Sequence, residues 1–171
     1  MRALARRLEN GDESQLVCWI KRNELACTVR PLRRHPRYAQ GGVTLPPKAR
    51  PLVDDWITLV KVEDIRSVLS LMHDADLPCY RQLGFRDESL LDHLTDAGLQ
   101  VARCPYGDPH YKKASAEEKL VSLLEVRERA LIAFRKLPKP VLIMCSSGID
   151  RSAPVAAFIV ETTSAAGESP K

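Results

Sequence analysis

The spacing of hydrophobic and polar residues divides the chain into short strands and longer helices. Near the start, two β-prone runs at residues 15–20 and 24–29 flank a polar turn, which predicts a hairpin. Residues 30–52 contain five prolines and two glycines, so we expect a loop there, with at most a short turn of helix. Residues 1–14 are polar and are predicted to form a flexible N-terminus.

From residue 53 onward, segments of helical periodicity alternate with short apolar runs. Helices are predicted over residues 53–62, 87–97, 115–137 and 149–162, and strands over residues 65–71, 99–104 and 141–144. This alternation is typical of an α/β fold, with a central, mostly parallel sheet flanked by helices on both faces. The wholly apolar run at 141–144 predicts a strand buried on both faces. Because ligands of such sheets bind beyond the carboxyl ends of the strands, the residues after 144 are the first place to look for a site.

Several residues have the properties of helix ends and buried faces. Asp87 is predicted as an N-cap, and Gly98 as the residue that follows the C-cap of the same helix. Ser115 and Glu118 have the spacing of a capping box at the start of the longest helix. The buried stripe of that helix is predicted to consist of Leu120, Leu123, Leu124, Leu131 and Phe134.

Composition indicates one globular domain. The 171 residues are 44% hydrophobic and 28% charged, and we assign the domain to residues 15–163, followed by a polar tail at 164–171. No apolar run is long enough to span a membrane, and the start lacks the apolar core of a secretory signal, so a cytoplasmic location is expected. The five cysteines, Cys18, Cys27, Cys79, Cys104 and Cys145, are odd in number and include no CxxC pair, and no histidine has zinc-like spacing, so we expect free thiols and neither a disulfide framework nor a metal. No cofactor is expected.

Charge is unevenly distributed along the chain. Residues 1–50 contain eleven Lys/Arg against four Asp/Glu, whereas residues 51–171 contain fifteen against eighteen. Residues 25–53 have no acidic residue and six basic ones, which are Arg30, Arg33, Arg34, Arg37, Lys48 and Arg50. This stretch either attracts an anionic partner, such as RNA or a phosphoinositide, or is a solvated basic loop.

The residues after the apolar strand have the chemistry of an anion site. Backbone N–H groups between a buried strand and a helix point to one spot, where the helix dipole adds positive potential suited to a phosphate. Gly148 allows the loop to curl, and the guanidinium of Arg151 can bind two phosphate oxygens. The predicted phosphate-binding residues are Ser146, Ser147, Gly148, Ile149, Asp150 and Arg151.

Cys145 is the candidate nucleophile of this loop. A helix N-terminus and a nearby arginine favour the thiolate form of a cysteine, and Ser152 is placed to hydrogen-bond the sulfur. The alternative is that Cys145 is a core cysteine and that Arg151 forms an ion pair at the end of the helix.

The spacing Cys145-x5-Arg151-Ser152 resembles the signature of the cysteine-dependent protein tyrosine phosphatases, most closely the small atypical dual-specificity phosphatases. CWIKRNELACTVRP looks like their entry hairpin, IRSVLSL with Asp74 and Asp76 like their first core strand and acidic turn, and LLDHLTDAGLQVARCPYGDP like their helix, strand and general-acid loop. The resemblance covers residues 16–162, and only the cysteine–arginine motif is sharply specific.

The resemblance implies roles for three further positions. Asp108 would be the general acid, and then the base that activates water, although an Asp-Pro pair is also a common turn. The family usually has His where this chain has Met144, a difference that leaves the rate of turnover open. Asp150 looks like the acid in the motif of several phosphoinositide phosphatases, or is simply a first-turn acid favoured by the helix dipole.

The expected function is that of a metal-independent phosphatase. It would hydrolyse phosphomonoesters, phosphotyrosine and also phosphoserine or phosphothreonine of proteins, through a cysteinyl-phosphate intermediate. Two alternatives remain at this point: a phosphatase of phosphoinositides or RNA 5′-phosphates that uses the basic stretch 25–53, and a phosphate-binding pseudophosphatase with a slow cysteine.

Overall fold

The computed structural model describes residues 10, 16–38, 43–107 and 115–167, to which all structural statements refer. Among them, five strands form one sheet in the order β1-β2-β5-β3-β4. The strands are Cys18–Lys21 (β1), Leu25–Val29 (β2), Ser67–Ser70 (β3), Gln100–Arg103 (β4) and Val141–Cys145 (β5). β1 is antiparallel to β2, and the other neighbouring pairs are parallel. The prediction of an α/β fold with a mostly parallel sheet is confirmed.

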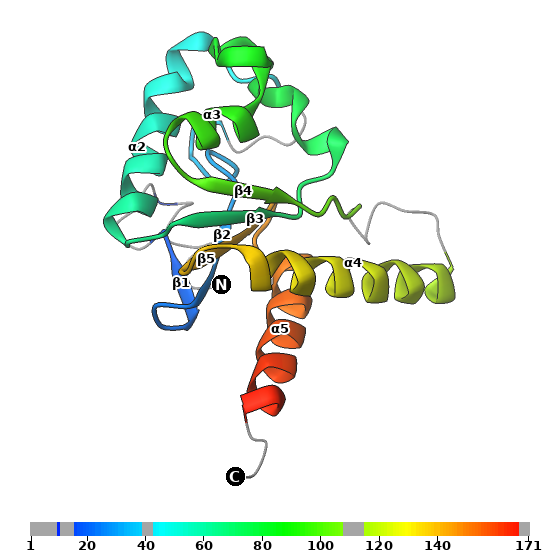
Figure 1. Ribbon diagram of the computed structural model, residues 1–171. Coiled ribbons are helices and arrows are strands. Elements are labelled where there is room, and N and C mark those ends of the chain that lie inside the picture. Colours follow the sequence, from blue (N-terminus) through cyan, green and yellow to red (C-terminus); the bar gives the residue numbers. More distant parts are fainter. Residues whose placement is uncertain (1–9, 11–15, 39–42, 108–114, 168–171) are drawn as a thin grey trace.

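Helices cover both faces of this sheet. The α-helices are Arg50–Val62 (α2), Leu90–Asp96 (α3), Ala116–Lys136 (α4) and Ser152–Gly167 (α5), and short 3-10 turns span Pro47–Ala49, Asp74–Asp76, Pro78–Leu83 and Arg86–Glu88. α2 and α3 lie on one side of the sheet, and α4 and α5 lie on the other (Figure 1). No helix in the described part of the chain combines the length and apolar character needed to cross a lipid bilayer.

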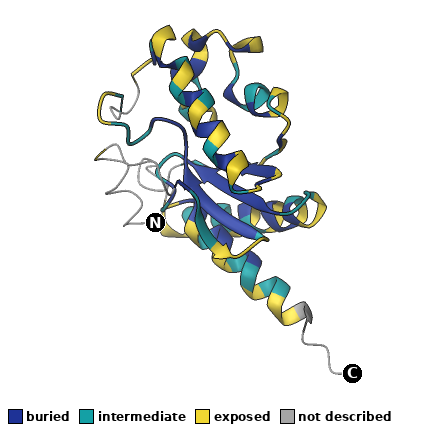
Figure 2. Cartoon of the chain, turned by 90° about the vertical axis from the view of Figure 1, so that its left-hand side faces the viewer, coloured by how far each residue is buried: buried dark blue, intermediate teal, exposed yellow. Residues whose placement is uncertain are grey.

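β5 is the centre of the fold and separates two apolar clusters. Its five residues are all buried, as expected of the apolar run in the sequence. Because side chains alternate along a strand, Leu142 and Met144 point toward α2 and α3, whereas Ile143 and Cys145 join the cluster under α4 and α5. Figure 2 shows the burial of the sheet between helices whose outer faces are exposed. Full burial of each large side chain contributes about 1.5–3 kcal/mol to folding.

Local signals in the sequence explain several element ends. The β1–β2 hairpin forms as predicted, and Asn23 in its turn has a φ of 59°, a conformation that asparagine tolerates better than most residues. The capping box of α4 is also confirmed: the Ser115 hydroxyl accepts the Glu118 N–H, and the Glu118 carboxylate accepts the Ser115 N–H. Gly98 follows the C-cap residue of α3 with a φ of 91°.

The predicted N-cap of α3 is wrong. Ser89 caps this helix, and its hydroxyl accepts the backbone N–H of Asp92 at 3.2 Å. Asp87 lies in the preceding 3-10 turn with a φ of 53°. Both residue types favour N-caps, so the backbone makes the difference. Ser89 has the extended conformation of an N-cap, whereas the positive φ of Asp87 does not suit that position.

The predicted buried stripe of α4 is correct only for the second half of the helix. Leu131 and Phe134 are buried and Leu123 is partly buried against the core, but Leu120 and Leu124 are 54% and 49% exposed. Figure 1 shows the reason: the first turns of α4 extend beyond the sheet, so no strand lies beneath them.

The bounds of two further helices also differ from those expected. α2 begins three residues earlier than predicted, within the proline-rich segment, because Pro51 occupies a position in the first turn where no N–H is needed. α5 begins at Ser152 rather than near residue 149, and it extends to Gly167, into the segment predicted as a polar tail.

Candidate anion site at the carboxyl edge of the sheet

Four chain segments meet where the parallel strands end. β2, β5, β3 and β4 run in one direction, so the segments that follow them lie at the same edge of the sheet. Backbone hydrogen bonds tie these segments together. The Arg30 N–H donates to the Cys145 carbonyl at 2.9 Å, the Leu71 N–H to the Met144 carbonyl at 2.8 Å, and the Tyr106 N–H to the Leu71 carbonyl at 3.2 Å. The predicted site loop therefore has a neighbour on each side.

The loop between β5 and α5 curls back onto the cysteine with which it begins. The backbone N–H of Gly148 donates to the Sγ atom of Cys145 at 3.1 Å. This return requires a φ of 73° at Gly148, a value that glycine adopts without strain. Cys145 is fully buried, and Gly148 is buried as well. The sulfur thus lies at the base of the loop, within reach of at least one inward-pointing amide.

Arg151 connects the end of this loop to two other segments. Its guanidinium binds both carboxylate oxygens of Asp76, with Nη1–Oδ2 at 2.5 Å and Nη2–Oδ1 at 3.2 Å. Nη1 also donates to the Tyr106 carbonyl at 3.0 Å and to the Leu71 carbonyl at 3.5 Å. Only 2% of the Arg151 side chain is exposed, so the planar group is fixed in one orientation.

Asp76 is the counter-ion in this arrangement. Burial opposes its ionisation, but the hydrogen bonds and positive charge of Arg151 outweigh that effect and hold the pKa of Asp76 below its ordinary value. The His73 N–H, which donates to the same carboxylate, acts in the same direction. The sequence suggested an acidic turn here, but the pairing of Asp76 with Arg151 joins positions 75 residues apart and was not predicted.

The middle of the loop is held by its own side chains. The Ser147 hydroxyl donates to Asp150 Oδ2 at 2.9 Å, and the Ile149 N–H donates to Ser147 Oγ at 3.4 Å. Asp150 is exposed, whereas Ser147 and Ile149 are half-buried. Asp150 thus stabilises the loop from its outer side.

Ser152 does not make the predicted contact with the sulfur. Its hydroxyl is fully buried at the first residue of α5 and has no hydrogen-bond partner among the residues described. Buried hydroxyl groups usually have a partner, so this hydroxyl is an unused polar group at the start of α5, directly after Arg151 in the sequence.

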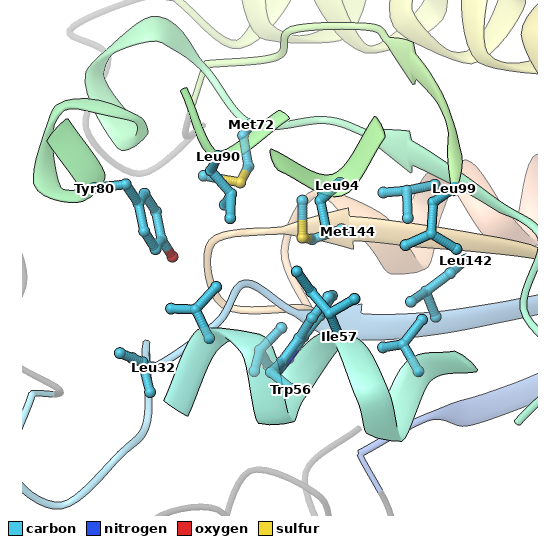
Figure 3. Close-up of a cluster of buried hydrophobic side chains, with 14 of the residues drawn as sticks. Leu32, Trp56, Ile57, Met72, Tyr80, Leu90, Leu94, Leu99, Leu142 and Met144 are labelled. Carbon is cyan, nitrogen blue, oxygen red and sulfur yellow. The ribbon is translucent and has the colours of Figure 1, made fainter. Parts of the chain in front are cut away.

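Two further positions singled out by the sequence are Asp108 and Met144. Asp108, the candidate general acid, lies outside the described residues, two positions after Tyr106. Met144 packs between Ile57 of α2 and Leu94 of α3, on the face of β5 opposite to Cys145 (Figure 3). Met144, where the sequence resemblance would lead one to expect a histidine, is thus a core residue.

Arg30 is the residue whose place the sequence least suggested. It was counted among the basic residues of the 25–53 stretch, yet it is only 7% exposed. Its Nε donates to Ser146 Oγ at 3.2 Å, and its Nη1 donates to the hydroxyl of Tyr80 at 3.0 Å and to Cys79 Sγ at 3.3 Å. Of the six basic residues in that stretch, this one belongs to the interior.

Comparison of the chain with models of protein families and with curated proteins gives no match. Function must therefore be inferred from the geometry. Residues 145–152 supply a buried sulfur contacted by an amide, a buried hydroxyl with no partner among the described residues, and a fixed guanidinium just before α5. Such a group of donors can bind a small oxyanion, and a thiolate among them can act as a nucleophile. The described residues gather no cluster of His, Cys, Asp or Glu that could hold a metal ion.

Proposed function

We propose that this protein is a cysteine-dependent phosphatase that hydrolyses phosphomonoesters, with phosphotyrosine and phosphoserine or phosphothreonine of proteins as its substrates. The observation that carries the proposal is the return of the 145–151 loop onto its own cysteine, with the Gly148 N–H directed at the Cys145 sulfur. Its place between a buried strand and a helix, with Arg151 at its end, supports a phosphatase-like fold and phosphate-binding loop.

The proposed reaction has two steps. The Cys145 thiolate attacks phosphorus, an S–P bond forms and the bond to the leaving oxygen breaks, while Asp108 gives that oxygen a proton. A water molecule then attacks the cysteinyl phosphate, the Asp108 carboxylate takes the proton of that water, and inorganic phosphate and the thiolate are released. Arg151 and the loop amides stabilise the charge on the phosphoryl oxygens in both steps.

Burial of the sulfur favours monoesters. Cys145 is fully buried at the base of the loop, so phosphorus must enter the loop to reach it. A terminal phosphoryl group has three free oxygens and one substituent, which can point outward. A phosphodiester has a second substituent on phosphorus, which would also have to fit beside the buried sulfur.

The alternative interpretation of the motif, a core cysteine with an ion-paired arginine, agrees with the burial of Cys145 and with the Asp76 pair. It gives no role to the Gly148 amide directed at the sulfur. The two interpretations differ in what the sulfur atom does, so a substitution that changes this atom alone separates them.

The test is hydrolysis of p-nitrophenyl phosphate in the presence of EDTA. We expect turnover by the wild-type protein and none by Cys145→Ser, which should still bind tungstate; Asp108→Asn should lower turnover by about 10²–10⁴-fold. Cys104→Ser is the matched control, because Cys104 is a buried cysteine of the same apolar cluster, and it should retain activity. Turnover that Cys145→Ser leaves intact, or no turnover by the wild type, would overturn the proposal.

A further inference from the structure

Arg30 connects the first residue of the site loop to a part of the chain that is distant in sequence. It directly follows β2, where Val29 is paired with Cys145, and its backbone N–H donates to the Cys145 carbonyl. From this point the side chain donates to the Ser146 hydroxyl on one side and to the Tyr80 hydroxyl on the other. The backbone and side chain of one residue therefore hold both Cys145 and Ser146.

The far end of this connection is rigid. Tyr80 is completely buried, and its hydroxyl donates to the Pro31 carbonyl at 2.6 Å while it accepts from Arg30. The guanidinium carbon lies 5.5 Å from the centre of the Tyr80 ring. Figure 3 shows Tyr80 at the edge of the cluster that α2 and α3 form over the sheet. Arg30 thus connects the start of the loop, at Ser146, to this rigidly packed region, at Tyr80.

The charge of Arg30 is also unusual for its surroundings. The groups that it contacts are two hydroxyl groups and the Cys79 thiol, and within the described residues no carboxylate is bonded to it directly. Burial opposes this charge, but Tyr80, Cys79 and the more distant Asp76 outweigh burial and keep the pKa of Arg30 above its ordinary value. Asp76 itself is bound to Arg151 through both oxygens. Two buried guanidinium groups therefore act on the Asp76 carboxylate, Arg151 through direct hydrogen bonds and Arg30 from a greater distance.

We infer that Arg30 is a positioning residue of the anion site: through Ser146 it fixes the start of the loop in the conformation that binds an oxyanion, and its buried charge adds to the attraction. The inference rests on the proposed function for its assay of turnover, but not for its assay of binding. Because the groups bonded directly to the Arg30 guanidinium are neutral, its charge is available to attract an anion that enters the loop.

The inference makes Arg30 and Ser146 act as a pair. Ser146→Ala breaks the hydrogen bond from Arg30 Nε and leaves the charge in place, whereas Arg30→Met removes both the hydrogen bond and the charge. Arg30→Lys keeps the charge but cannot reach Ser146, Tyr80 and Cys79 together, because its ammonium group has no fork. If Arg30 acts through Ser146, the effects of the double variant are smaller than the product of the single effects.

The experiment measures two quantities for each variant: kcat/KM for p-nitrophenyl phosphate, and the Kd of tungstate by calorimetry. A displacement of about 1 Å in a reacting group can cost about 100-fold, so we expect Arg30→Met to lose about that factor in kcat/KM and to bind tungstate at least tenfold more weakly. Arg30→Lys should recover part of both losses. Ser146→Ala should lower kcat more than it raises KM.

Arg50→Met is the matched control. Arg50 also donates to a partner distant in sequence, the Gly84 carbonyl at 2.6 Å, and also lies over an aromatic ring, that of Phe85, at 5.4 Å. None of these contacts belongs to the loop. We expect its substitution to change kcat/KM and the Kd of tungstate by less than threefold, whatever it does to stability.

The outcomes separate this inference from the proposed function. If Cys145→Ser abolishes turnover while Arg30→Lys and Ser146→Ala stay within threefold of the wild type in both measurements, the role of Arg30 is refuted and the phosphatase proposal stands. If the wild type turns over no faster than Cys145→Ser but tungstate binding weakens in the Arg30 variants, the site binds anions and the proposed function fails. Should Arg30→Met not fold, Arg30→Lys and Ser146→Ala carry the test alone.

Discussion

Substitution of Asp76 by asparagine tests whether the paired guanidinium of Arg151 is a structural element of the fold. The side chains of the pair are 2% exposed for Arg151 and 18% exposed for Asp76, and the two groups share two hydrogen bonds. Asparagine keeps the shape and an acceptor oxygen for the His73 N–H, but it removes the negative charge. The variant therefore leaves a buried cation with a neutral partner.

The magnitude follows from the burial of the pair. Removing one partner of a fully buried ion pair costs about 3–5 kcal/mol, and the partial exposure of Asp76 places this case near the lower value, about 3 kcal/mol. With an m-value of about 2 kcal/mol/M, the urea midpoint at pH 7 should fall by about 1.5 M. Because a domain is stable by only about 5–15 kcal/mol, this is a large fraction of the total.

The dependence on pH gives a second, independent signature. The pKa of Asp76 is lower in the folded protein than its ordinary value of 3.8, so its contribution to stability is complete above about pH 4 and is lost as the pH falls through the lowered pKa. The asparagine of the variant does not titrate. The difference in stability between the two proteins should therefore be constant from about pH 5 to 7 and should shrink below about pH 4.

Asp74→Asn is the control, because Asp74 lies two residues away and forms an ion pair with Arg103 on the exposed surface. Exposed pairs contribute little, so this variant should unfold close to the wild-type midpoint. The reasoning would be refuted if urea titrations gave Asp76→Asn the same midpoint as Asp74→Asn, or if the difference from the wild type stayed unchanged down to about pH 2.

Three further predictions concern the fold. Ser89→Ala should lower the free energy of unfolding by about 1 kcal/mol, whereas no loss would mean that α3 does not begin at this cap. Leu131→Ala should cost about 3 kcal/mol and Leu124→Ala less than about 0.5 kcal/mol in the same urea assay; equal losses would contradict the overhang of α4. Burial raises the pKa of Cys27 to about 12, so iodoacetamide at pH 8 should label Cys18, which is partly exposed, much faster than Cys27. Peptide mass spectrometry measures the two labelling rates, and faster labelling of Cys27 would contradict this prediction.

The sequence was sufficient for the order and type of the main elements because their patterns are local. The apolar run that became β5 and the capping box at Ser115 are each readable within a few residues. The exposure of Leu120 was not readable, because helical periodicity shows which face is apolar but not how far the sheet beneath it extends. The same holds for Asp87, whose residue type suits a cap although its backbone does not.

For the candidate site, the sequence indicated the loop but not what holds it. Cys145 and Arg151 were identified from spacing within one segment. Asp76 lies 75 residues before Arg151, and Arg30 lies 116 residues before Ser146. Only the order of the parallel strands brings these residues together. Arg30 was also hard to identify because it lies in a basic stretch of the sequence, where a buried arginine cannot be distinguished from the solvated ones beside it.

The strand order explains why the loop is held from two sides. In the sheet, β5 lies between β2 and β3, so the segment after β2 reaches the start of the loop and the segments after β3 and β4 reach its end. Arg30 bonds to Ser146 at the start, and Asp76 bonds to Arg151 at the end. Both attachments use a buried guanidinium, which has several donors in one plane and can join chain segments beyond the ends of the strand ladders. Substitutions at either attachment should therefore alter the loop as a whole, whereas substitution of the exposed Asp150 should alter only its outer turn.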